Sequence, residues 1–121
     1  MLKVDAVARP SEIHGLGLFA QVFIPAGTVI WEYAPPFDVV FTEAQLRQLS
    51  QPAQRQVLYY AAFDSEQGAY LLSGDDDRFI NHSDTPTAKD GGHVVVALMD
   101  IPQGAEITLD YREIGSTFRS K

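Results

Sequence analysis

The stretch Phe79–Pro86, which reads FINHSDTP, decides how the rest of this sequence is interpreted. Its two apolar residues lead straight into Asn81, His82 and Ser83, whose side chains can all donate or accept hydrogen bonds. An aspartate and a proline then end the run. The stretch therefore predicts polar groups beside the core, where they either bind a ligand or form an ordinary polar loop.

The size and composition of the chain predict one globular domain over residues 1–121. The residues are 45% hydrophobic and 21% charged, which is typical of a domain with a real core and leaves no room for a second one. No apolar run approaches the ~20 residues that cross a bilayer, and the start MLKVDAVARP lacks the features of a signal peptide. We therefore expect a soluble, intracellular protein without a membrane partner, cytoplasmic or, in a eukaryote, nuclear.

The absence of cysteine and the excess of acidic residues narrow the function classes. Without cysteine the chain has no disulfide, no thiolate metal site and no cysteine nucleophile. Nine basic against sixteen acidic residues give a formal charge of −7, which repels phosphate backbones and argues against direct nucleic-acid binding. The same charge would attract a basic peptide or protein, although it could also serve only to keep the protein soluble.

Short segments rich in valine, isoleucine, phenylalanine and tyrosine alternate with glycine and proline along the chain. This punctuation predicts a mostly β fold with many short strands and little helix. The residues Asp64–Gly68 have the composition of a hairpin loop. We expect strands at Lys3–Arg9, Leu18–Val22, Thr28–Tyr33, Phe37–Phe41, Tyr59–Phe63, Tyr70–Leu72, Val94–Met99 and Glu106–Leu109.

A capping box predicts the main helix. Thr42 and Gln45 lie three residues apart, and two leucines that follow supply an apolar stripe. This helix should begin at Thr42 and end by about Pro52. A second short helix over Pro52–Tyr59 is compatible with the sequence, so helix should be a minor part of the fold.

One sequence pattern occurs twice. Ile24–Ile30 and Ile101–Ile107 both read I-P-x-G-x-x-I, and an acidic residue and a tyrosine follow each, Tyr33 in the first copy and Tyr111 in the second. Two copies are too few for a solenoid. We expect two similar Pro-Gly turns that feed core strands, with proline fixing φ and glycine supplying the unusual backbone angle.

A glycine-rich motif lies near the start of the chain, where His14–Phe19 reads HGLGLF. A dinucleotide-binding loop needs a third glycine and a helix directly afterwards, whereas the residues that follow here look like a strand. That class of site is therefore excluded. What remains is either a plain turn or a turn whose glycines let main-chain groups approach a ligand.

Taken together, these motifs resemble the SET-domain protein-lysine methyltransferases. The order is RPSEIHGLGLFAQVFIPAGTVIWEY at 9–33, RFINHSDTP at 78–86 and VVVALMDIPQGAEITLDY at 94–111. The resemblance spans Arg9 to Tyr111 and leaves 112–121 as a short C-terminal tail. It implies a β-clip-like fold of several small curved sheets, one or two short helices and a C-terminal pseudoknot that brings residues 81–83 against Asp110 and Tyr111.

The same resemblance implies an enzyme that transfers methyl groups from S-adenosylmethionine to a lysine side chain of a basic, histone-like protein or peptide. Tyr111 would be the catalytic tyrosine, and Tyr33 would face the lysine channel. Asn81 and His82 would grip the cofactor, in keeping with the hydrogen-bonding capacity of their side chains. The implied cofactor-binding residues are His14, Gly15, Leu16, Gly17, Arg78, Phe79, Asn81 and His82. Phe118 would lie over the adenine, close the channel or pack elsewhere.

Other interpretations stay open. A SET-like module could bind peptide or cofactor without turnover, and so short a chain could complete its site by forming a homodimer. The spacing of His14, His82 and His93 matches no metal-ligand pattern, and no metal is expected. Asp75–Asp77 lacks the alternation of a calcium loop and is interpreted as a solvated turn that could favour basic residues beside the target lysine.

Overall fold

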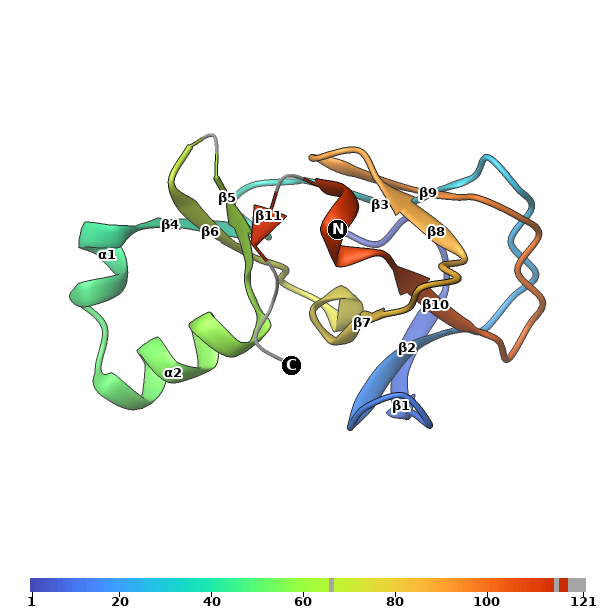
Figure 1. Cartoon of the computed structure of the whole chain (residues 1–121), viewed down its shortest axis with the longest axis horizontal. Coiled ribbons are helices and arrows are strands. Elements are labelled where there is room, and N and C mark those ends of the chain that lie inside the picture. Colours follow the sequence, from blue (N-terminus) through green and yellow to red (C-terminus); the bar gives the residue numbers. More distant parts are fainter. Residues whose placement is uncertain (66, 115, 118–121) are drawn as a thin grey trace.

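The computed structural model describes residues 1–65, 67–114 and 116–117. Three small β-sheets, two α-helices and two short 3-10 helices form this part of the chain. Figure 1 shows both α-helices together at one end of the molecule. The predicted mostly β fold with several small sheets is confirmed. No helix in the described ranges is long and apolar enough to cross a bilayer.

The sheet that carries the candidate site has the strand order β1-β2-β10-β7. β1 (Ala6–Pro10) and β2 (Leu16–Ala20) form an antiparallel hairpin, and β10 (Glu106–Leu109) adds antiparallel to β2. β7 (Asn81–His82) then pairs parallel with β10. A strand from late in the chain therefore lies in the middle of this sheet, between segments from earlier in the chain.

Each of the other two sheets contains one hairpin, extended by strands from elsewhere in the chain. The second sheet has the order β3-β9-β8, with β3 at Val29–Glu32, β9 at Val94–Ala97 and β8 at Ala88–Asp90. The third has the order β11-β5-β6-β4, with β11 at Ser116–Thr117, β5 at Ala62–Asp64, β6 at Ala69–Leu72 and β4 at Val39–Thr42. The antiparallel pairing of β5 with β6 confirms the predicted hairpin loop between them.

The first helix, α1 (Glu43–Arg47), begins at the predicted capping box. Thr42 Oγ1 accepts a hydrogen bond from the Gln45 N–H at 3.2 Å, and the Gln45 side chain accepts one from the Thr42 N–H at 2.9 Å. α1 ends at Arg47, earlier than expected. The second helix, α2 (Gln51–Tyr60), is the longer of the two, with 10 residues.

The strand predicted at Tyr59–Phe63 is wrong at its start, because Tyr59 and Tyr60 belong to α2. Aromatic residues favour strands, but the Ser50 side chain caps this helix and a proline follows in its first turn. The helix then continues until Ala61 adopts an extended conformation, and β5 starts only after it. The very short β7, β8 and β11 were not predicted, because two or three residues carry no periodicity.

The acidic run Asp75–Asp77 is not the solvated turn that the sequence suggested. The first two carboxylates accept hydrogen bonds from the main-chain N–H groups of Leu2, at 2.8 Å, and Ala8, at 2.9 Å. The third, Asp77, is only 3% exposed. The run therefore ties the N-terminal segment to the 3-10 helix η1 (Asp76–Phe79), which leads directly into β7.

The two predicted Pro-Gly turns are present, and they meet in space. Ile24 and Ile101 form an antiparallel bridge in which each N–H donates to the carbonyl of the other, at 2.9 and 2.8 Å. Gly27 and Gly104 adopt the left-handed backbone that each turn requires, with φ of 84° and 87°. Both isoleucines belong to the main core cluster, which also holds Leu18, Ile30, Ile80, Ile107 and Tyr111.

Candidate active site

Residues 81–83 run alongside the end of β10, as the pseudoknot expectation requires. Asn81 lies opposite Thr108 and His82 lies opposite Leu109 in a parallel register. The Ser83 N–H continues the ladder by donating to the Leu109 carbonyl at 2.9 Å. The residues that follow β10 are thereby brought beside those that surround β7.

Tyr111 is the first residue of η2 (Tyr111–Ile114) and is 7% exposed. Its hydroxyl donates to the Ile80 carbonyl, and its N–H donates to His82 Nδ1 at 3.1 Å. The rings of Tyr111 and His82 meet edge to face with their centroids 5.4 Å apart. A hydroxyl that donates to a fixed carbonyl has a fixed orientation, and its oxygen keeps acceptor capacity. The three contacts hold the phenol in one place.

The His82 ring bridges two segments. Because Nδ1 accepts the Tyr111 N–H, that nitrogen carries no proton in the neutral ring. The proton is therefore on Nε2, which lies 3.0 Å from Asp84 Oδ1 and donates to it. His82 thus connects the residues after β7 with those after β10.

Asp110 is held in its ionised form by Arg112. The guanidinium donates to both carboxylate oxygens at 2.9 Å, and its Nη2 also reaches Asp84 Oδ1 at 3.0 Å. Hydrogen bonds from the Arg112 side chain and main chain, aided by its charge and by His82, lower the pKa of Asp110 from 3.8 to about 2. A charged network therefore surrounds the segment that carries Tyr111.

Asn81 connects β7 to the loop between β1 and β2. Asn81 is only 1% exposed. Its Nδ2 donates to the carbonyls of His14 at 3.0 Å and Leu16 at 3.1 Å. Nδ2 also lies 3.1 Å from Glu106 Oε2. The amide nitrogen of Asn81 is thus used within the protein, and the role predicted for this residue in holding a cofactor would fall to its side-chain oxygen.

The two glycines of the G-x-G motif have different surroundings. Gly15 has a left-handed backbone with φ of 44°, and a Cβ built there would meet nothing within 4 Å. A Cβ on Gly17 would instead lie 2.4 Å from Glu106 Oε2. The space beside Gly15 is therefore open, whereas Gly17 is buried inside the sheet.

The remaining predicted site residues have contacts of their own. Arg78 donates from Nε and Nη2 to the Ser73 carbonyl, at 3.2 and 2.8 Å, and the Phe79 ring meets the Tyr60 ring edge to face at 5.3 Å. Tyr33 comes from a different sheet, follows β3, and has its ring 5.1 Å from that of His93. Phe118 lies outside the described residues.

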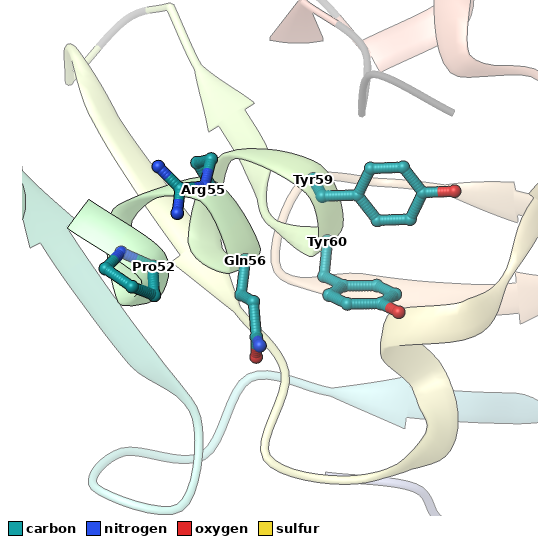
Figure 2. A pocket seen from close by; sticks show the side chains of 5 residues that line it. All are labelled: Pro52, Arg55, Gln56, Tyr59 and Tyr60. Atoms are coloured by element: carbon teal, nitrogen blue, oxygen red, sulfur yellow. The ribbon is translucent and has the colours of Figure 1, made fainter. Parts of the chain in front are cut away.

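A pocket that the sequence analysis missed opens beside α2, with a volume of about 460 Å³. It is lined by Pro52, Arg55, Gln56, Tyr59 and Tyr60. Figure 2 shows the two tyrosine rings extending from the C-terminal end of α2 toward the same side. Two successive aromatic residues shortly after an arginine were the available signal, but they were assigned to a strand. Through the contact of Tyr60 with Phe79, this pocket adjoins η1.

Metal ligands do not gather in the part of the chain that the structure describes. Within it, no group of three or more histidine, aspartate or glutamate side chains could hold a metal ion. His14, His82 and His93 come from three separate regions, namely the β1–β2 loop, β7 and the turn before β9.

Comparison with known proteins places the chain in a family. The SET domain family matches residues 15–112, so this chain belongs to the SET-domain family and the resemblance predicted from the three motifs is confirmed. A curated relative, the histone-lysine N-methyltransferase, H3 lysine-4 specific, of Chaetomium globosum, is 35% identical over 132 aligned residues. The alignment covers 90% of this chain but only 11% of the length of that relative.

Solved structures show the same fold. Polycomb Repressive Complex 2 from Chaetomium thermophilum matches 92% of this chain with a TM-score of 0.69 at 21% identity, over 16% of its own chain. The Neurospora SET domain protein DIM-5, a histone lysine methyltransferase, matches 91% of this chain with a TM-score of 0.57 at 23% identity, over 53% of its own chain. At these identities the likeness concerns the fold.

Proposed function

We propose that this protein is an S-adenosylmethionine-dependent protein-lysine N-methyltransferase. Membership of the SET-domain family and the activity named for the curated relative support the reaction class. The observation that carries the proposal is the parallel pairing of β7 with β10, since it sets the Tyr111 hydroxyl on the Ile80 carbonyl beside Asn81 and His82. Those three residues are the ones that the motifs nominate for cofactor binding and chemistry.

The loop between β1 and β2 has the features needed to hold the cofactor. Residues 12–16 are exposed, and the space beside Gly15 is open. Zwitterionic amino-acid groups, such as the methionine part of S-adenosylmethionine, are well matched by main-chain donors and acceptors. Asn81 would add its side-chain oxygen from β7. When bound, the cofactor supplies an electrophilic methyl group on a sulfonium.

The chain's own contribution to the reaction is positioning. Methyl transfer to an amine is an in-line displacement, so nitrogen, methyl carbon and sulfur must be held nearly collinear. The oxygen of Tyr111 and the Ile80 carbonyl, already fixed against each other, would orient the lysine nitrogen and accept weak C–H contacts from the methyl group. These groups do not need to act as a strong base.

The target lysine must lose its proton before it can attack. With a pKa of ~10.4 only about one lysine in 2,500 is neutral at pH 7, a cost of roughly 4.6 kcal/mol. An apolar channel and a nearby positive charge both lower the lysine pKa. Tyr33, at the end of β3, and the tyrosines of the α2 pocket could line such a channel.

The substrate class follows from charge. The formal charge of −7 favours a basic protein or peptide, and a histone is one such protein. An extended peptide could pair with an exposed strand at a sheet edge and send one lysine toward Tyr111. Histone H3 is the first candidate to test, because the name of the curated relative specifies it.

A radiolabelled methyl-transfer assay tests the proposal directly. The protein would be incubated with labelled S-adenosylmethionine and a panel of lysine-rich proteins including histone H3, and modified lysines would be mapped by mass spectrometry. Incorporation that requires Tyr111 would support the enzyme. Tight cofactor binding without transfer to any panel member would instead favour a SET-like binding module, and absence of cofactor binding would overturn the proposal.

A further inference from the structure

Glu106, a half-buried carboxylate with no part in the chemistry proposed above, holds the loop between β1 and β2. It is the first residue of β10, and both of its oxygens accept from Ser11 Oγ, at 2.8 and 3.0 Å. Oε2 also accepts from Asn81 Nδ2 at 3.1 Å. One carboxylate therefore joins this loop to two strands of the sheet, β7 and β10.

Ser11 organises the loop from within. Its N–H donates to the Gly15 carbonyl at 2.8 Å, and its Oγ accepts from the Ile13 N–H at 3.0 Å. The same Oγ donates to Glu106, so the loop's internal hydrogen bonds are anchored to the sheet through one hydroxyl. Asn81 adds the two bonds to loop carbonyls described above. A carboxylate, an amide and a hydroxyl thus fix the path of the main chain around Gly15.

Glu106 also bears on why position 17 is a glycine, because a Cβ there would require the Glu106 carboxylate to move. A Cβ there would lie 2.4 Å from Glu106 Oε2 and 3.1 Å from Asn81 Nδ2, the first of which is closer than real Cβ atoms approach. Position 15 has open space beside it, and it requires glycine because its backbone is left-handed. The two glycines of the motif therefore have separate causes, and only Gly17 depends on Glu106.

We propose that Glu106 and Ser11 are positioning residues that set the conformation of the β1–β2 loop and, through it, the affinity for the cofactor. The identity of that cofactor, S-adenosylmethionine, rests on the proposed function, whereas the loop geometry does not. Neither side chain would touch the methyl group or the lysine. Their loss should weaken cofactor binding and leave turnover at saturating cofactor within about two-fold.

Calorimetric titration with S-adenosylmethionine separates these effects. Glu106→Ala leaves Ser11 and Asn81 without their shared acceptor, so Kd should rise about ten-fold or more, and Ser11→Ala should raise it less. Asp5→Ala is the matched control, because it removes one negative charge from an exposed position outside that loop. A Kd for Glu106→Ala equal to that of Asp5→Ala, or a collapse of kcat with Kd unchanged, would overturn the assignment.

A readout without cofactor keeps this test separate from that of the reaction. Amide hydrogen exchange at Ser11 and Ile13, whose N–H groups bond within the loop, should accelerate in Glu106→Ala while the core strands stay protected. If the wild-type protein binds no S-adenosylmethionine, the proposed function fails, yet this exchange still decides the structural claim. Unchanged exchange at both amides would refute it.

A suppressor experiment tests the contact with Gly17. Gly17→Ala should weaken cofactor binding, since its methyl group would push the Glu106 carboxylate away from Ser11 and Asn81. In the double variant Gly17→Ala/Glu106→Ala that obstacle is gone, so the two losses should be less than additive. Full additivity would show that Glu106 is not what demands glycine at this position.

Discussion

The phenol of Tyr111 is held by its hydroxyl, by its main-chain N–H and by the His82 ring. Its ring also belongs to the main core cluster, so the residue combines packing with a fixed polar group. Removal of the oxygen alone separates the two roles, because phenylalanine preserves the ring. The Ile80 carbonyl would then lose a partner while the surrounding core stays filled.

We expect Tyr111→Phe to lower kcat for methyl transfer ten-fold or more while the Kd for S-adenosylmethionine changes little, since the lost oxygen orients the reacting groups. Steady-state kinetics and calorimetry measure the two quantities. Tyr70→Phe is the matched control, because Tyr70 donates to Glu43 far from this site. Turnover in Tyr111→Phe equal to that of the control would remove the assigned role.

The lowered pKa of Asp110 predicts how the stability of the protein changes in acid. Because its pKa is lowered to about 2 in the folded protein, its contribution to stability is complete above pH ~4 and is lost as pH falls toward 2. Arg112→Ala should raise the pKa of Asp110 toward its ordinary value and flatten this part of the stability profile. NMR titration of the Asp110 carboxyl would measure its pKa in both proteins. Thermal midpoints between pH 5 and 2 would measure the change in the pH dependence of stability.

The control for that experiment is Arg9→Ala, which removes a cation from an exposed position on β1. An Asp110 pKa that is the same in Arg112→Ala as in Arg9→Ala would contradict the role given to the Arg112 hydrogen bonds.

Sequence reasoning found some residues of the site and missed others for a physical reason. Asn81, His82 and Tyr111 stand in motifs that resemble those of the SET-domain family, and that resemblance implied their juxtaposition. Ser11 and Glu106 are 95 positions apart, and their hydrogen bond depends on how β10 pairs with β2. No local sequence pattern could have linked Ser11 to Glu106. The functions assigned to all of these residues stay predictions until they are tested.

Among the helices and strands, the features that depend only on neighbouring residues were predicted from the sequence. The capping box at Thr42 and the hairpin between β5 and β6 follow from neighbouring residues and were predicted. A second helix over Pro52–Tyr59 was one of two alternatives for Tyr59, and the structure has that helix. The early end of α1 and the helical state of Tyr60 were not predicted, because the Ser50 cap of the second helix overrode the strand preference of the tyrosines. β7 has two residues and exists only through its partner β10.

The α1 cap gives a prediction at this scale. Thr42→Ala removes the acceptor for the Gln45 N–H in a helix of only five residues, so the free energy of unfolding should fall by about 1 kcal/mol. Urea denaturation measures it. Thr42→Ser keeps the oxygen and should stay within a few tenths of a kcal/mol of wild type; equal losses in both variants would argue against the cap.

The charge of the whole molecule predicts how substrate binding responds to salt. With a formal charge of −7, the KM for a basic peptide should rise several-fold as NaCl increases from ~50 to ~500 mM, because screening shortens the reach of the attraction. Initial rates at fixed, saturating S-adenosylmethionine would measure the effect.

The comparison peptide carries the same target lysine with its flanking lysines and arginines replaced by glutamine. Its KM should be nearly independent of salt. An equal salt response for both peptides would mean that the acidic surface serves solubility and does not recruit the substrate.

The position of β10 in the middle of its sheet also sets the order in which the molecule can be assembled. During synthesis β1, β2 and β7 leave the ribosome before β10. Until β10 has been made, β2 and β7 lack the strand that pairs with both of them. The bridge between Ile24 and Ile101 must likewise close across a long stretch of chain. Such non-local pairing makes folding slow. It also leaves the edges of β2 and β7 open to other chains until β10 docks between them. A nascent chain arrested before residue 106 should therefore be highly sensitive to protease.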